Sequence, residues 1–385
     1  MLFKLTDEQL MIQSMVREFA RKEVAATAAE RDKTKEFPTE NLKKMGELGF
    51  LGMMTPVEYD GEGADSISYV LALSEIAYAC ASTAVVMSVH NSIVCGSINR
   101  YGTEAQKQKY LGALARGEYI GAFALTEPHA GSDPVMQNTV AERDGDVYVL
   151  NGTKRFITSG RNSGLVIVTA KTSPDARHKG ISAFLVEKSF PGIIVGREED
   201  KMGLRASDTT DLILEDCQVP VENMLGKEGE GFKIAMTALD GGRIGIAAQS
   251  LGVAQAALDA AVKYAKSRDQ FGRKVSKFQG LRWMIADMAT QIEAARQLTL
   301  SAAAMKARHE NFTGQASMAK LFASEMVNRV TAKALQIHGG YGYTKEYAVE
   351  RYYRDARVFM IYEGTSEIQR VVISNYILKD KRKTH

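Results

Sequence analysis

The sequence predicts a mostly helical α+β fold, with a domain of antiparallel strands between two helical domains. Five of the seven prolines fall between residues 128 and 220, and none follows residue 220. Because proline lacks a backbone N–H and disfavours helix interiors, the proline-free C-terminal part indicates helices. The proline-containing part carries short runs of β-branched and aromatic residues, which are typical of strands. With 385 residues, the chain is long enough for two or three domains of about 150 residues each.

The first domain is expected to be helical and to cover residues 1–118. Its first predicted helix has apolar residues at helical spacing around a charged face: Leu10, Ile12, Met15, Val16 and Phe19. Residues 76–99 contain no charged side chain and are long enough to cross a bilayer. Their Ser, Thr, His and Asn side chains would lack partners in hydrocarbon, so the sequence predicts a buried segment of a protein without a membrane span.

The second domain is expected at residues 119–226. Predicted strands lie at 147–150, 165–169, 181–186 and 212–214, and turns such as Asp144-Gly145 separate them. The third domain, residues 227–385, is expected to be a helical bundle. One of its helices has Ile285, Met288, Ile292 and Ala295 on a single face.

Composition excludes several classes of protein. The net charge is +3 with both signs interspersed, which does not favour a nucleic-acid partner. The three cysteines have no metal-ligand spacing, so neither a metal site nor a disulfide framework is expected. The N-terminus has neither an apolar signal core nor an Arg/Ser-rich transit pattern. We expect a cytoplasmic protein, or a mitochondrial matrix protein from which a transit peptide has been removed.

Glu363 is the strongest candidate for a catalytic carboxylate. It follows the apolar run 358–362 and precedes Gly364. A carboxylate brought into a dry site has a raised pKa, as a general base requires, and the glycine lets a substrate approach the backbone. The alternative is an exposed glutamate in a loop, with Thr365 capping the next helix.

Four further segments could bind a ligand, although each also has a purely structural interpretation. The turn at 125–133 has small and hydroxyl side chains that leave backbone N–H groups free for a heterocycle or a pyrophosphate. Phe156 and Thr158 could contact a ring or pack in a core. The glycine-rich run 226–231 is not a dinucleotide fingerprint, and the run 336–342 could be a ligand contact or a helix C-cap. Asp240 and Arg243, three residues apart on a predicted helix, could be a surface pair or contact an anion or amide.

The order of these segments resembles that of the acyl-CoA dehydrogenases. The resemblance rests on residues 124–133, on 268–272, on 336–340 and on Tyr362-Glu363-Gly364-Thr365, and it extends from about residue 5 to residue 380. It implies an N-terminal helical domain, a middle β domain and a C-terminal four-helix bundle. It also implies a flavoenzyme that converts an acyl-CoA thioester to the trans-2-enoyl-CoA. In the family a carboxylate removes the α-proton while the β-hydrogen passes as hydride to N5 of FAD.

The resemblance assigns a role to each matched residue. Glu363 is the base, and Ser132, Asp240, Arg243, Tyr362 and Gly364 match substrate contacts. The residues matching contacts to the FAD ring and pyrophosphate are Phe123, Leu125, Thr126, Ser132, Phe156, Ile157 and Thr158, with Thr365 and Glu367 after the base. Phe156 stands where relatives commonly have tryptophan, and Glu367 where many have glutamine. The residues matching contacts to the FAD of a neighbouring subunit are Arg268, Gln270, Phe271, Phe278, Gln279, Gln336, Gly339 and Gly340. They imply a homotetramer built as a dimer of dimers.

Two departures from related enzymes indicate that the base remains at Glu363 and that a dicarboxylic substrate is disfavoured. Gly242 occupies the position of the base in isovaleryl and long-chain relatives, and Ala84 is the nearest match to an arginine that glutaryl-CoA relatives use. The resemblance implies that the uncharged run 76–99 forms the apolar wall of the acyl pocket, and the similarity of this run to short-chain members favours butyryl-CoA. We expect electrons to pass to an electron-transferring flavoprotein, and the same residues could reduce crotonyl-CoA. Alternatives are a branched or aromatic acyl-CoA, O2 as acceptor, or a non-catalytic acyl-CoA or flavin-binding module.

Overall fold

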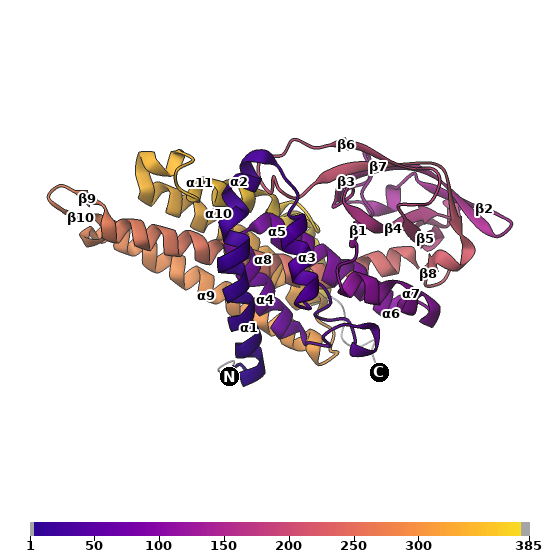
Figure 1. Cartoon of the computed structure of the whole chain (residues 1–385), viewed down its shortest axis with the longest axis horizontal. Helices are drawn as coiled ribbons and strands as arrows, with labels where there is room; N and C mark the ends of the chain where they lie inside the picture. The colour runs from indigo at the N-terminus through magenta and orange to yellow at the C-terminus, as the bar shows by residue number, and fades with distance from the viewer. Residues whose placement is uncertain (1–3, 379–385) are drawn as a thin grey trace.

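The computed structural model describes residues 4–378, and these form a helical part, a β-sheet and a second helical part in chain order. The order agrees with the mostly helical α+β fold expected from the sequence. Figure 1 shows the sheet at one end of the molecule and the helices filling the rest.

The N-terminal part consists of short helices. Its elements are α1 (Asp7–Phe19), the π-helical turn η1 (Ala20–Val24), α2 (Ala25–Thr34), α3 (Thr39–Glu47), α4 (Ser66–Ala79), α5 (Ala81–Ser88), the π-helical turn η3 (Val89–Cys95), α6 (Gly96–Tyr101) and α7 (Glu104–Ala115). Thr6 and Gln9 form a capping box that starts α1 by satisfying backbone N–H groups on both residues. Gln9 also donates to the Asp65 carboxylate at the start of α4 (2.8 Å), which joins the two helices.

The uncharged segment is a core segment, as the sequence predicts. Residues Ala81–Tyr101 are apolar and long enough to span a bilayer, but 94% of their most apolar window is buried inside the protein. Most polar groups here have partners: His90 Nε2 lies 3.0 Å from the Leu114 carbonyl, and Asn91 donates to the Phe50 carbonyl. The Gly121 N–H donates to His90 Nδ1, so Nε2 carries the proton. Burial lowers the pKa of His90 to about 4 and keeps the ring neutral.

The middle part is a single eight-stranded sheet. Its strands are β1 (Ile120–Ala124), β2 (Val140–Asp144), β3 (Val147–Thr158), β4 (Ser163–Lys171), β5 (Ile181–Glu187), β6 (Ile193–Glu198), β7 (Thr209–Pro220) and β8 (Met224–Leu225). The spatial order is β6-β7-β3-β2-β4-β5-β8, with β1 also paired to β4. Most pairs are antiparallel, as expected, but β1 runs parallel to β4, and so does one residue pair between β2 and β4. The hairpin β2–β3 intervenes between β1 and β4 and brings the chain back in the same direction.

The C-terminal part is built on three long helices. Its elements are α8 (Gly231–Ser267), the hairpin β9–β10 (Asp269–Gln270 and Arg273–Lys274), α9 (Gln279–Ala307), α10 (Thr313–His338), the 3₁₀ turn η8 (Gly339–Tyr343), α11 (Val349–Ala356), the 3₁₀ turn η9 (Arg357–Met360) and α12 (Ser366–Leu378). Helix α10 packs against α8, α9 and α12, which gives the expected bundle. Helix α8 also packs against α4, α5 and η3, so the two helical parts share one large apolar core. The sheet contributes to this core through side chains such as Leu165, Ile167 and Leu185, and its remaining buried side chains form a second, smaller core.

Candidate active site

Glu363 lies on a turn between η9 and α12, and its carboxylate points into the protein. Both carboxylate oxygens are buried and accept no hydrogen bond from a described residue. Oε2 lies against Gly242 of α8, where a Cβ would overlap it. Burial raises the pKa of Glu363 to about 7, although the charges of Lys320 and then Arg243 oppose this rise. A buried carboxylate without a hydrogen-bond donor is therefore poised to take up a proton near neutral pH.

The backbone of this turn is strained, and side chains of α10 and α12 hold it in place through hydrogen bonds. Glu363 has a φ of 51° and Gly364 a φ of 91°. The left-handed conformation is unfavourable for a residue with a side chain, so the surroundings must impose it at Glu363. Lys320 of α10 donates to the Gly364 carbonyl (2.7 Å). Gln369 of α12 donates to the carbonyls of Gly364 (2.9 Å) and Glu363 (3.3 Å). Two buried side chains, Lys320 and Gln369, thus fix the two carbonyl groups that follow the left-handed backbone bond of Glu363.

Tyr362, which the sequence suggests as a substrate contact, already uses its hydroxyl group within the protein. The hydroxyl donates to Gln249 Oε1 on α8 (2.6 Å), and Gln249 donates to the Ala81 carbonyl at the start of α5 (2.8 Å). The Tyr362 ring stacks parallel to Phe359 at 5.8 Å. This chain of bonds joins the Glu363 turn to α8 and α5, so the ring of Tyr362 is the part left to face a ligand.

Asp240 and Arg243 form a pair that is mostly buried, in contrast to a surface pair. Arg243 donates to Asp240 (2.6 Å) and to Ser317 (3.2 Å), and Thr313 donates to the other oxygen of Asp240 (2.6 Å). The Arg243 Nε atom is buried without an acceptor among the described residues. Desolvation raises the pKa of Asp240 and lowers that of Arg243. A polar group of a ligand could use the free Nε donor, on the helix that also supports Glu363.

The candidate flavin-ring residues of the β domain come together at the ends of β1 and β3. The Arg155 N–H donates to the Thr126 carbonyl (2.8 Å), which places residues 125–127 beside the end of β3. Phe156 has a φ of 58°, and its ring is 56% exposed. Thr126 and Thr158 are half-buried beside it, Phe123 packs at the edge of the core, and Leu125 is buried. Ser132 is exposed in the following turn.

Ile157 differs from its neighbours because its side chain belongs to the core of the sheet. Its backbone is the part that could reach a cofactor. Glu127, between the two candidate segments, is buried and forms an ion pair with Lys154 (2.7 Å). Lys154 also donates to the Leu125 carbonyl (3.2 Å), so this pair braces the segment on which Leu125 and Thr126 lie.

The second group of candidate flavin contacts lies at the opposite end of the molecule. Arg268, Gln270, Gln336, Gly339 and Gly340 line one pocket of about 520 Å³. Figure 1 shows the β9–β10 hairpin of this region far from the sheet. Neighbouring aromatic side chains are exposed, with Phe271 91% exposed and set edge-on to Phe278 at 6.0 Å. Gln279 is also exposed. Gly339, with φ 58° and ψ −137°, has open space on its Cα and leaves its backbone accessible.

Thr365 and Glu367 start α12 directly after the Glu363 turn. Thr365 Oγ1 accepts a bond from the Ile368 N–H (3.3 Å), so it caps the helix, as one of the sequence interpretations suggested. Glu367 is exposed, and local hydrogen bonds hold its pKa below the ordinary value. Ala84, the residue in place of a glutaryl-specific arginine, is fully buried on α5.

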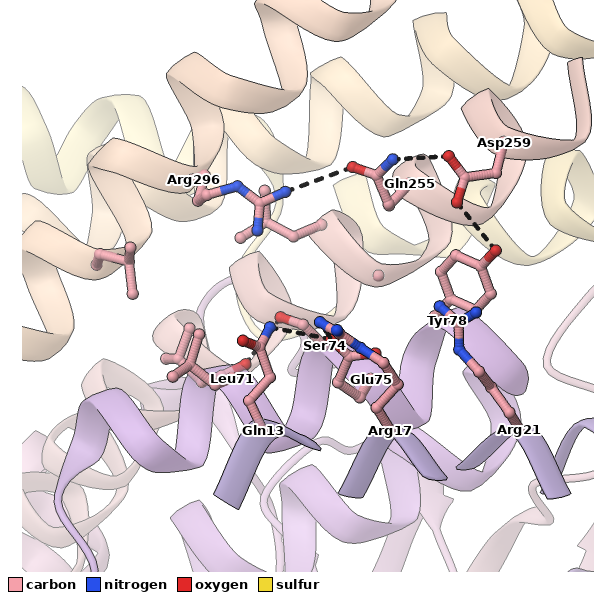
Figure 2. Close-up of a pocket in the computed structure, with 14 residues that line it drawn as sticks. Gln13, Arg17, Arg21, Leu71, Ser74, Glu75, Tyr78, Gln255, Asp259 and Arg296 are labelled. Atoms are coloured by element: carbon pink, nitrogen blue, oxygen red, sulfur yellow. Dashed lines mark hydrogen bonds and ion pairs between the residues drawn. The ribbon is translucent and has the colours of Figure 1, made fainter. Parts of the chain in front are cut away.

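A separate cavity of about 180 Å³ lies between α1, α4, α8 and α9 and contains none of the candidate residues. Figure 2 shows hydrogen bonds that join its polar and charged side chains to one another. Arg17 and Gln13 donate to Glu75, and Tyr78 and Gln255 donate to Asp259. Because both carboxylates already accept hydrogen bonds within the protein, the cavity is a polar boundary between the two helical parts.

Three family models match consecutive parts of the chain. The acyl-CoA dehydrogenase N-terminal domain matches residues 6–118, the middle domain residues 122–217 and the C-terminal domain residues 229–378. The chain belongs to the acyl-CoA dehydrogenase family. It is therefore a flavin-dependent oxidoreductase.

Individual acyl-CoA dehydrogenases resemble the chain over nearly its whole length. A short-chain specific acyl-CoA dehydrogenase of Clostridium acetobutylicum is 53% identical over 98% of this chain and all of that protein. The structure of butyryl-CoA dehydrogenase from Megasphaera elsdenii has a TM-score of 0.97 and 46% identity, covering 98% of this chain and 100% of that one. A chain in a structure described as the electron transferring flavoprotein of Acidaminococcus fermentans has a TM-score of 0.98 and 52% identity, covering 99% and 100%.

The residues present fit the flavin that acyl-CoA dehydrogenases require. An exposed aromatic ring and half-buried hydroxyl groups stand side by side at the end of β3, beside backbone held by Lys154. At the other end of the molecule, Gly339 and Gly340, which have open space around them, line a mostly apolar pocket that also contains Arg268, Gln270 and Gln336. The two surfaces are far apart in one chain, so they would hold one cofactor only if two subunits meet there.

The sequence did not reveal the buried residues that support the candidate site through hydrogen bonds to backbone carbonyls. Lys320, Gln369, Gln249 and Lys154 are buried, and each donates to a backbone carbonyl next to a candidate residue or in the chain that supports it. Lys320 left a signal in the sequence, because it interrupts an apolar stripe on α10. The stripe consists of Ala316, Ala319, Ala323 and Val327, all fully buried. A charged residue within such a stripe is unusual and indicates a buried polar role.

Proposed function

We propose that this enzyme dehydrogenates short-chain acyl-CoA, converting butyryl-CoA to crotonyl-CoA, with Glu363 as the base that removes the α-proton. The observation that carries this proposal is the buried, unpaired Glu363 carboxylate with its pKa raised to about 7. A base whose pKa lies near the working pH combines an ionised form with a strong tendency to accept the proton. The similarity to the Clostridium acetobutylicum and Megasphaera elsdenii proteins supports a short acyl chain.

The chain's own residues would prepare the substrate for this proton transfer. FAD, when bound, supplies the hydride acceptor. We assign the backbone N–H of Glu363 to the thioester carbonyl, because a donor there stabilises the negative charge that develops when the α-proton leaves. Arg243 and Asp240 orient the CoA portion, while Tyr362 and Gly364 line the substrate beside the base. In the reverse direction, protonated Glu363 returns the proton to the α-carbon, so the same groups serve the reduction of crotonyl-CoA.

A homotetramer is part of the proposal, since it would supply two surfaces to each FAD. The ring would lie against Phe123, Leu125, Thr126, Phe156, Ile157 and Thr158, with Ser132 near the pyrophosphate and Thr365 and Glu367 beyond the base. The neighbouring subunit would contribute the second surface, from Arg268 to Gly340. The likeness to a chain from the Acidaminococcus fermentans structure supports an electron-transferring flavoprotein as acceptor. Three buried free cysteines fit a reducing compartment, either the cytoplasm or the mitochondrial matrix.

The deciding experiment is an anaerobic titration of the purified yellow protein with butyryl-, octanoyl-, isobutyryl- and glutaryl-CoA, followed by the oxidised flavin band. We expect butyryl-CoA to bleach the band at the lowest concentration. If another of the four thioesters bleaches the band at a lower concentration than butyryl-CoA does, the proposed substrate class is wrong and the class of that thioester takes its place. Absence of bleaching by all four would favour a binding module. Oxygen consumption during turnover tests O2 as the acceptor.

The Glu363→Gln variant tests the base directly. It should keep the flavin and bind butyryl-CoA but lose turnover by several orders of magnitude, on the scale of about 10²–10⁴-fold that a general base contributes. Normal turnover would remove Glu363 from the mechanism.

A further inference from the structure

We propose that Lys320 is a positioning residue for Glu363, holding the left-handed turn that aims the carboxylate over Gly242. The proposal rests on the function proposed above, in which Glu363 is the base. Lys320 does not touch the reacting atoms; it acts through the turn and through its charge.

The Lys320 ammonium lies against the backbone of the Glu363 turn. Its side chain is fully buried on α10, and Nζ donates to the Gly364 carbonyl at 2.7 Å. Among residues 4–378, no carboxylate lies within 4.0 Å of this ammonium. A buried ammonium without a carboxylate partner is costly, and an apolar residue at this point of the α10 stripe would avoid that cost. Stability alone therefore does not explain the lysine.

Gln369 secures the same carbonyl, but it cannot replace Lys320. Its amide donates to Gly364 (2.9 Å) and Glu363 (3.3 Å) from the α12 side, whereas Lys320 approaches from α10. Two donors on one carbonyl fix both the position and the tilt of the peptide group between Gly364 and Thr365. Because Glu363 has a φ of 51°, a small rotation of this turn would withdraw its carboxylate from the space over Gly242.

The charge of Lys320 adds a second effect. The titratable and charged groups that face Glu363 are Lys320 on α10, Arg243 on α8, Tyr69 on α4 and the neighbouring Tyr362. Of these, Lys320 does most to lower the pKa of Glu363 against the effect of burial. Lys320 in turn interacts with the more distant Glu367 and Glu325, and burial lowers its own pKa to about 8. At neutral pH Lys320 is therefore mainly a cation and favours the ionised base.

The test uses the flavin-loaded protein and three substitutions that separate the two effects. Lys320→Met removes the charge and the hydrogen bond, Lys320→Gln removes the charge but keeps a donor, and Lys320→Arg keeps the charge. Lys306→Met is the matched control. Lys306 is a lysine of α9 whose pKa burial also lowers to about 8, but it donates to Met54 Sδ (3.8 Å) and has no effect on the pKa of Glu363.

The first readout is the pH dependence of kcat/KM for butyryl-CoA. The acid limb is the part of the profile in which kcat/KM falls as the pH is lowered. In Lys320→Met and Lys320→Gln this limb should move to higher pH by about 1 unit, because these variants lack the nearby positive charge that lowers the carboxyl pKa by that order. Lys320→Arg and Lys306→Met should keep the wild-type limb. In Lys320→Met, kcat at pH 9 should also fall about 10- to 100-fold through misplacement of the base.

The second readout is hydrogen–deuterium exchange of residues 361–366 in the same proteins. Exchange should be faster in Lys320→Met than in the wild type and unchanged in Lys306→Met. If Lys320→Met lowers thermal stability but leaves both the acid limb and this exchange unchanged, Lys320 is only structural and the proposal is wrong. If Lys320→Met and Lys320→Gln do not fold, the Lys320→Arg variant decides the question. Because this variant retains the positive charge, a shift of its acid limb away from the wild-type pH would contradict the proposal.

The two proposals fail in distinguishable ways. If Glu363→Gln retains turnover, the assignment of the base is wrong, whatever the Lys320 variants do. If Glu363→Gln is inactive while Lys320→Met and Lys320→Gln keep the wild-type pH profile and kcat, only the role of Lys320 is wrong.

Discussion

The carboxylate of Glu363 occupies the space over Gly242 in which any other residue would place its Cβ. The two residues are 121 positions apart, one on the turn before α12 and the other within the long helix α8. Glycine within a helix is normally unfavourable by about 0.5–1 kcal/mol relative to alanine. At this position the missing side chain leaves room for the Glu363 carboxylate.

We therefore expect Gly242→Ala to remove activity without removing the fold. The methyl group would displace the Glu363 carboxylate, and a misplacement of about 1 Å can reduce the rate about 100-fold. Flavin reduction by butyryl-CoA measures the loss, and thermal unfolding with flavin content shows whether the protein is intact. Gly241→Ala is the matched control, because its Cβ would meet Lys306 Nζ at 3.5 Å and the Ser92 carbonyl at 3.7 Å, which are ordinary contacts. Equal losses in the two variants would contradict the interpretation.

The raised pKa of Glu363 also predicts how stability depends on pH. The pKa is about 7 in the folded protein, against the ordinary value of 4.5 in the unfolded chain, so the folded state favours the protonated form. Between these values the folded protein binds more protons than the unfolded chain, and its stability falls as the pH rises. A difference of this size is worth about 3 kcal/mol at pH 8.

Glu363→Gln should abolish this penalty. Chemical unfolding should show the variant close to the wild type at pH 4.5 and more stable than it at pH 8. Glu367→Gln is the control, since Glu367 is exposed and its pKa is lowered, whereas that of Glu363 is raised. If Glu363→Gln is no more stable than the wild type at pH 8, the carboxyl of Glu363 keeps an ordinary pKa in the folded wild type and is not desolvated.

The pH profile of the wild type follows from the same value. We expect kcat/KM for butyryl-CoA to rise about tenfold per pH unit below pH 7 and to level off above it, because Glu363 must be ionised to accept the α-proton. Steady-state rates at several pH values, with flavin content checked at each, measure the limb. An acid limb near pH 4.5 would mean that Glu363 is not desolvated before the substrate binds.

The sequence predicted the arrangement of the domains because that arrangement depends on local chemistry. Proline position, apolar periodicity and strand composition are read within windows of a few residues, and they separated helices from strands correctly. The parallel pairing of β1 with β4 was not predicted, since pairing direction is set by the path of the chain between strands. The π-helical turns η1 and η3 also left no clear pattern in their residues.

The candidate site also has features that the sequence predicted and features that it did not. Glu363 was singled out by its flanking residues, but its left-handed backbone and its contact with Gly242 depend on residues from another helix. Lys320 acts through a backbone carbonyl, and the sequence contains no information on which carbonyl a buried lysine reaches. Motifs thus identified the candidate side chains, while the contacts that support them emerged only with tertiary structure.

A last prediction concerns the ion pair beneath the candidate flavin segment. Lys154 and Glu127 are both buried, 2.7 Å apart, and Glu127 also accepts bonds from the Thr139 N–H (3.0 Å) and hydroxyl. Lys154 further donates to the Leu125 carbonyl (3.2 Å). Lys154→Met would leave the Glu127 charge buried without its cation. We expect a loss of about 3–5 kcal/mol in unfolding free energy, the usual cost of breaking a buried pair.

Flavin content should fall together with stability in Lys154→Met, because residues 125–127 would lose the bond that holds their backbone. The double variant Lys154→Met/Glu127→Gln removes the unpaired charge, so it should recover part of the stability, with a coupling of about 0.5–3 kcal/mol between the two sites. Lys44→Met, which breaks an exposed pair with Glu23, is the control and should change neither quantity appreciably. Chemical unfolding and flavin absorbance on the wild type, Lys154→Met, Glu127→Gln, the double variant and Lys44→Met give both measurements. Strict additivity of the two substitutions would show that Lys154 and Glu127 support the flavin segment independently.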